Sequence, residues 1–221
     1  MTITAYDDAL AWLLAPDAAN PGVRYFALRD LLDQPADAPE VAAAQTSVMA
    51  SGPVPAILAV QAPEGYWVEP EPVYYPKYTG TVWQLIFLAQ FGADGRDPRV
   101  AAACEYVLDH ARSSYGGFSA GASPAGMIHC LAGNLAAAML DLGRLGDARL
   151  DTALDWLARS ITGAGIAPAE EKDAPIRYYR SGNSAPGFAC SANNHQPCAW
   201  GAVKAMLALS KVPEAARTPA I

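Results

Sequence analysis

Three copies of one pattern follow each other along the chain, and this periodicity constrains the fold more than any other feature. Each copy has an aromatic turn, a connecting stretch and a short motif that ends in glycine and opens an apolar segment. The copies begin at Gly65, Gly116 and Pro186 and read GYW, KYTG, TVWQLIFLAQFG; GGF, CLAG, NLAAAMLDLG; and PGF, CAWG, AVKAMLALS. From the aromatic residue to the start of the motif the distances are 10, 12 and 10 residues. The repeat predicts an array of similar folded units.

Each unit is predicted to contain two helices. In the apolar segments, hydrophobic residues recur at three- and four-residue steps, as in Val82, Leu85, Ile86 and Ala89 and in Leu135, Ala138, Met139 and Leu142. A second helix is expected after Asp97, with Pro98 in its first turn, and another after Asp147, 50 residues later. No strand with convincing alternation is seen. The fold class is therefore predicted to be all-α, an array of helical hairpins.

The chain divides into an N-terminal helical region, 1–54, and a repeat region, 55–221. In the first region, helices are predicted over 7–14, 23–32 and 39–49, separated by proline breaks, and an apolar stripe is predicted from Val23, Ala27, Leu28, Leu31 and Leu32. A long polar insertion between residues 161 and 186 is typical of a functional or mobile loop. After Ser210 the sequence is similar to the approach to another outer helix. We expect either that this helix has been lost or that the chain is part of a longer one.

Charge and composition exclude some classes of function. The net charge is −7 and there is no run rich in Lys and Arg, so a nucleic-acid partner is not expected. Uninterrupted apolar stretches such as Leu135–Leu140 are too short to span a membrane. The start, MTITAYDDAL, carries acids where a signal peptide has a basic end, so we expect a cytoplasmic protein with four free or metal-bound cysteines.

The residues QAPEGYW, at 61–67, match the core of the QW repeat of squalene and oxidosqualene cyclases. From about Pro55 to Leu209, the copies also resemble the prenyltransferase/squalene-oxidase repeat shared with the β-subunits of protein prenyltransferases. This resemblance implies an α/α toroid, in which inner helices line a central cavity and outer helices cover them.

The chain departs from this superfamily in two respects. The DxDD motif with which class II terpene cyclases protonate their substrate is absent, so cyclisation of squalene is not expected. The hairpins are also fewer than a closed ring requires. The ring is therefore expected to be open, or to be completed by a second chain or by residues beyond Ile221.

A metal site is predicted at the starts of the inner helices. Cys130 and Cys198 occupy the same place in two copies, and Cys190 and His195 lie in the loop before the second of these helices. Thiolate and imidazole are the ligands that Zn²⁺ prefers. HQPCAWG is similar to the stretch of prenyltransferase β-subunits that carries a zinc-binding His, although their Asp-x-Cys pair has no clear equivalent here. Alternatively, these cysteines only fill space, as we expect for Cys104.

Candidate substrate-binding residues lie beside this site. Trp67, Tyr75 and Trp83 are predicted to hold an isoprenoid or other apolar molecule, and Lys77, where the other copies carry cysteine, to bind an anionic group such as diphosphate. His129, which adjoins Cys130, completes the set. The alternative is that the aromatic residues only pack the turn and that Lys77 is solvated.

The sequence supports two functions. The first is a non-catalytic binding or assembly module with a structural zinc, because four protein ligands would close the metal site. The second is a zinc-dependent enzyme or carrier, in which three ligands leave room for a substrate. Homo-oligomers are expected because an open array leaves a helix face uncovered.

Overall fold

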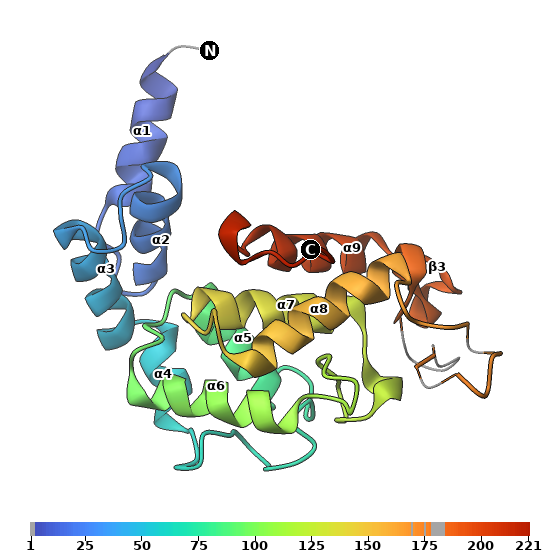
Figure 1. Ribbon diagram of the computed structural model, residues 1–221. Coiled ribbons are helices and arrows are strands. Elements are labelled where there is room, and N and C mark those ends of the chain that lie inside the picture. The colour runs from blue at the N-terminus through green and yellow to red at the C-terminus, as the bar shows by residue number, and fades with distance from the viewer. Residues whose placement is uncertain (1–2, 169, 175, 178–183) are drawn as a thin grey trace.

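The computed structural model describes residues 3–168, 170–174, 176–177 and 184–221. This part of the chain is mostly helical, as predicted (Figure 1). The α-helices are α1 (Ile3–Leu14), α2 (Pro21–Phe26), α3 (Pro39–Ala50), α4 (Pro53–Ala59), α5 (Thr81–Gln90), α6 (Pro98–His110), α7 (His129–Asp141), α8 (Ala148–Thr162) and α9 (Ala199–Ser210). A π-turn, η1 (Ala27–Leu31), and four 3₁₀ turns, η2 (Pro124–Gly126), η3 (Pro186–Phe188), η4 (Ser191–Asn193) and η5 (Glu214–Ala216), complete the helical elements of these residues.

The repeat region forms two layers of helices. Helix α7 packs between α5 and α9 in an inner layer, while α6 packs on α5 and α8 packs on α7 from outside (Figure 1). Helices α7 and α9 approach closely at Gly133, where a Cβ atom would lie 2.4 Å from the Lys204 carbonyl. The first two copies are therefore helical hairpins, as the periodicity predicted, and α9 is the inner helix of the third.

The outer helices begin at the predicted aspartates. Asp97 and Asp147 each accept a hydrogen bond from the backbone N–H two residues ahead, and Pro98 is the first residue of α6. Each aspartate also pairs with the arginine at that position, Arg99 or Arg149. The Arg149 hydrogen bonds lower the pKa of Asp147 to about 2. The predicted starts of both helices are confirmed, with an aspartate as the N-cap of each.

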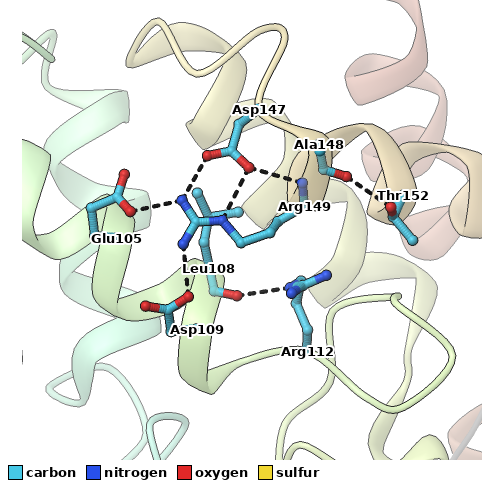
Figure 2. A network of polar contacts seen from close by, with 8 residues as sticks. All are labelled: Glu105, Leu108, Asp109, Arg112, Asp147, Ala148, Arg149 and Thr152. Carbon is cyan, nitrogen blue, oxygen red and sulfur yellow. Dashed lines mark hydrogen bonds and ion pairs between the residues drawn. The ribbon is translucent and has the colours of Figure 1, made fainter.

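Arg149 also joins the two outer helices, as Figure 2 shows. Its guanidinium lies 2.7 Å from Glu105 and 2.7 Å from Asp109, both on α6. The three carboxylates raise the pKa of the Arg149 guanidinium. This network of polar contacts fixes the position of α8 relative to α6.

The aromatic turns of the first two copies reach into the core. Trp67 and Phe118 are almost fully buried, whereas Phe188 of the third copy is only half-buried. The Trp67 indole donates to the Ile57 carbonyl at 2.8 Å, and its backbone N–H donates to the Thr81 hydroxyl at 3.1 Å. The turn of the first copy thus fixes the start of its own unit through buried contacts.

The third copy contains strands, which the sequence did not predict. Strands β1 (Ser184–Ala185), β2 (Ala189–Cys190) and β3 (Gln196–Pro197) form an antiparallel sheet in the order β1-β2-β3. Ala189 pairs with Pro197 and Cys190 with Gln196. Strands of two residues are too short for an alternating pattern to reveal. Part of the predicted polar insertion, 169, 175 and 178–183, lies outside the described residues.

In the N-terminal region all three predicted helices exist, but the predicted stripe is only partly buried. Ala27 and Leu28 are buried, whereas Val23, Leu31 and Leu32 are exposed. For Leu31 and Leu32 the cause is the π-turn: the Leu32 N–H donates to the Ala27 carbonyl, five residues back, so these side chains rotate away from the expected face.

Among the described residues, no single helix has both the length and the apolar character needed to cross a bilayer. Helices α3 and α4 meet these criteria only as a pair, which is bent by 47°.

Candidate functional site

The predicted metal ligands come together in part. Cys130 lies in the first turn of α7, Cys198 precedes α9 and Cys190 lies on β2. Burial raises the pKa of the Cys130 thiol, and the neighbouring Cys190 and Cys198 raise it further. We call these three residues the thiol cluster. The sequence equivalence of Cys130 and Cys198 thus corresponds to proximity in the fold.

The small sheet holds the starts of α7 and α9 together. The Ser184 N–H donates to the Met127 carbonyl at 3.2 Å, and the Ser184 hydroxyl accepts from the His129 N–H at 2.7 Å. On the other side, the Cys198 N–H donates to the Phe188 carbonyl at 2.9 Å. The thiol cluster therefore lies between two helix starts that the same short segment connects.

Cys198 has a local structural role as well. Its Sγ accepts a hydrogen bond from the Gly201 N–H at 3.4 Å, which caps the first turn of α9.

Lys77 of the first copy reaches the same region. Its Nζ lies 5.0 Å from the centre of the Tyr78 ring, and Tyr78 is the main cause of its raised pKa. Tyr74 and Cys130 contribute to the same increase. The residue that replaces cysteine in the first copy is therefore within electrostatic reach of the thiol cluster.

Aromatic residues surround Lys77. Tyr74 and Tyr78 each pack on Trp83, with ring centres 5.2 and 5.0 Å apart, and the Trp83 indole donates to the Tyr74 carbonyl at 3.0 Å. Tyr75 packs edge-on against Tyr74 and is exposed. Tyr75 and Trp83 thus belong to one surface cluster. Trp67 does not, because it is only 2% exposed and offers a ligand almost no surface.

His129 points between α7 and α8. Its ring is 3% exposed, and Nε2 lies 3.0 Å from the Ser160 hydroxyl of α8. Phe188 packs edge-on against the ring. The other ring nitrogen, Nδ1, is buried and has no hydrogen-bond partner among the described residues. Burial lowers the pKa of His129 to about 4, so the imidazole is neutral at physiological pH.

The donor atoms suit zinc better than their arrangement does. His195 is exposed, and its backbone has a φ of 60°. Within the part of the chain that the structure describes, no three His, Cys, Asp or Glu side chains form a group that could hold a metal ion. Zinc binding stays a prediction.

The cavities lie away from most predicted substrate-binding residues. One of about 270 Å³ lies between α2 and α3 and is lined by residues that include Arg24, Glu40 and Ser47. At His129 there is a cavity of only about 20 Å³, which is enough for one water molecule. Neither is the central apolar cavity that the family resemblance implies.

The structure identifies the residues of an uncovered helix face, which the sequence led us to expect but did not locate. Helix α9 exposes a stripe of apolar side chains, Trp200 (62%), Val203 (62%), Met206 (51%) and Leu207 (44%), which we call the α9 face. An alignment of the three copies shows which residues of α9 take the place of core residues in the earlier helices. The positions equivalent to Val203, Met206 and Leu207 are almost fully buried in both earlier copies, as Val82, Leu85 and Ile86 and as Leu135, Ala138 and Met139.

No family model, no curated protein and no solved structure matches this chain. Its function is therefore inferred from the residues of the site and from the geometry of the repeats.

Proposed function

We propose that this protein is a non-catalytic binding or assembly module built from helical repeats, and that the α9 face is its binding surface. The observation that carries this proposal is the difference in burial between equivalent positions. Val203, Met206 and Leu207 are exposed, while their counterparts in the first two copies are core residues. An exposed apolar stripe of this kind marks an interaction surface rather than a solvated one.

The energetics favour a macromolecular partner. Burial of a large apolar side chain stabilises a contact by roughly 1.5 to 3 kcal/mol relative to full exposure. Three or four half-exposed side chains in one stripe therefore provide several kcal/mol. Lys204 is the charged residue beside the stripe. Its Nζ lies 4.8 Å from the centre of the Trp200 ring, so the lysine does not interrupt the apolar stripe.

We extend the proposal to the arrangement of the units. Two hairpins with inner and outer layers, followed by a further inner helix, support an open arc of the α/α-toroid type. In such an arc, the α9 face is the position where an outer helix of the third unit would pack.

A selection experiment tests the proposed function. A display library of random 20-residue peptides would be selected on the immobilised protein and counter-selected on a Val203→Asp/Leu207→Asp variant. We expect binders that require the α9 face. If every binder retains full affinity for the variant, or if no binder emerges from a folded protein, the proposal is wrong.

A second candidate is a zinc-dependent enzyme or carrier that acts on an isoprenoid or other apolar substrate. It is favoured by the thiol cluster, which unites residues of two copies and lies within reach of Lys77 and Tyr74. In this case the aromatic residues would contact the hydrocarbon, and Lys77 would contact its anionic end.

Metal content and ligand binding separate the two candidates. The second predicts one zinc per chain in dialysed protein, which is lost in Cys130→Ala and in Cys198→Ala. Cys104→Ala is the matched control, because burial raises the pKa of that thiol to about 11 and keeps it protonated. The second candidate also predicts saturable binding of a polyprenyl diphosphate. A zinc-containing protein without such binding would support a structural metal in a binding module.

A further inference from the structure

We infer that the α9 face binds an amphipathic helix of a partner protein, in the place that α6 occupies on α5 and that α8 occupies on α7. This inference depends on the proposed function, because it names the kind of partner that the same surface takes. Three independent features of the third copy lead to it.

The first feature is the apolar stripe itself. In the first copy, the equivalent stripe of α5 is buried in a core to which α6 contributes Val100, Cys104 and Val107. In the second copy, α8 contributes Leu150, Leu154 and Leu157 to the core around α7. A helix with the same spacing of apolar residues would cover Val203, Met206 and Leu207 in the third.

The second feature is the aromatic turn. In the first copy it touches α6: a Cβ atom on Gly65 would lie 2.5 Å from the Ala102 carbonyl, and Tyr66 packs on Tyr106 at 5.3 Å.

In the second copy the turn touches α8 in the same way. A Cβ on Gly116 would lie 2.3 Å from Thr152, and one on Gly117 would lie 2.2 Å from Trp156. Thr152 and Trp156 are the α8 residues equivalent to Ala102 and Tyr106 of α6, because each stands 50 residues later in the sequence. A Cβ on Gly187 of the third copy would have no atom of the described residues, beyond its immediate neighbours, within 4 Å. The turn is therefore open on the side where an outer helix packs in the first two copies.

The third feature is charge. Arg149, in the first turn of α8, binds Glu105 of α6 and so joins one outer helix to the previous one (Figure 2). Asp155 of α8 stands 50 residues after Glu105 and thus has the equivalent place. Its carboxylate is partly exposed, and among the described residues it makes a long contact, 3.5 Å, with Arg159 of its own helix. An arginine in the first turn of a partner helix would form an ion pair with Asp155, as Arg149 does with Glu105.

These features define the chemistry of the partner. It presents a helix with apolar residues at three- and four-residue spacing, and with an arginine in its first turn on the side toward α8. Within the described part of a second copy of this chain, the outer helices α6 and α8 are not free to take this place, because their apolar residues are buried in their own core. We therefore infer a partner protein, rather than α6 or α8 of a second copy, as the source of this helix.

A peptide with the sequence of residues 147–162, acetylated, amidated and fluorescently labelled, is the probe. It carries the aspartate, the arginine and the apolar stripe of α8. Fluorescence anisotropy would follow its titration with the whole protein. We expect saturable binding that weakens at least tenfold in Val203→Asp and a few-fold in Asp155→Asn. Val60→Asp is the matched control, because Val60 is an exposed apolar residue outside α9, and it should leave binding unchanged.

Several outcomes would overturn the inference. They are no binding to a folded wild type, equal binding to Val203→Asp, or a discrete dimer of the protein that blocks the peptide. If the library selection nevertheless yields binders that need the α9 face and do not compete with the peptide, only the identity of the partner is wrong. If neither experiment shows a dependence on Val203, the proposed function fails as well.

Discussion

Helices α7 and α9 come from the same sequence pattern and end in different environments. In α7, residues on all sides of the helix are buried, because α5, α8 and α9 surround it. In α9, Ala205 and Ala208 are buried against α7, and Val203 and Met206 on the opposite side are exposed. The repeat pattern thus specifies which residues an inner helix offers for packing, while the neighbouring unit decides whether they become core or surface.

The largest expected effect is the difference in the free energy of unfolding between Leu135→Asp and Val203→Asp. These two variants change the same repeat position in two copies. Leu135 is fully buried, so a carboxylate there should destabilise the fold by roughly 4 kcal/mol or more. Val203→Asp should change the free energy of unfolding by less than about 0.5 kcal/mol, because the side chain is exposed. Urea unfolding followed by circular dichroism measures both. Similar losses in the two variants would show that α9 is covered in solution.

A smaller effect is expected from His129, which adjoins Cys130 of the thiol cluster. The pKa of His129 is about 4 in the folded protein and about 6.5 in the unfolded chain, so the unfolded state takes up a proton first as the pH falls. The contribution of neutral His129 to the free energy of unfolding is complete above pH 6.5. As the pH falls from 6.5 to 4 this contribution, up to about 3 kcal/mol, is lost.

Unfolding by urea at several pH values tests this expectation. His129→Gln should flatten the dependence over this range, because it removes the buried imidazole. A wild type whose stability is constant from pH 6.5 to 4 would contradict the burial of a neutral imidazole.

The smallest expected effect compares the arginines that begin the outer helices. Arg149→Ala removes contacts to Glu105, Asp109 and Asp147, and it should cost about 1 kcal/mol. Arg99→Ala removes the pair with Asp97 and should cost only a few tenths of a kcal/mol. Thermal unfolding at low and high salt measures both. Because these contacts are partly exposed, salt should reduce the difference; a difference that salt leaves unchanged would point to packing instead.

The features of the fold that depend on local sequence were predictable. The starts of the second helices at Asp97 and Asp147 and the pairing of helices in the first two copies follow from residues close in the chain, and the structure confirms them. The π-turn after α2 and the strands around Cys190 were not predictable. The first depends on the backbone hydrogen-bond register of a single turn, and the second on pairings of only two residues each.

The candidate site was predictable in its residue types and less so in its geometry. Equivalent positions of two copies do bring Cys130 near Cys198. The direction of the His129 side chain was missed, because it depends on the partner that α8 provides. An uncovered helix face was expected, but its residues on α9 were not identified, because periodicity describes the residues a helix offers and not the neighbours it has.

The burial of α9 on one side only also bears on how the molecule opens. In a linear array, each unit gains most of its stability from contacts with adjacent units, and terminal units have the fewest. Hydrogen exchange of backbone amides is therefore expected to be fastest, among the three inner helices, in α9 and slowest in α7. A ligand on the α9 face would slow this exchange without touching α7, and the protection of the third unit would then report on occupancy of the surface.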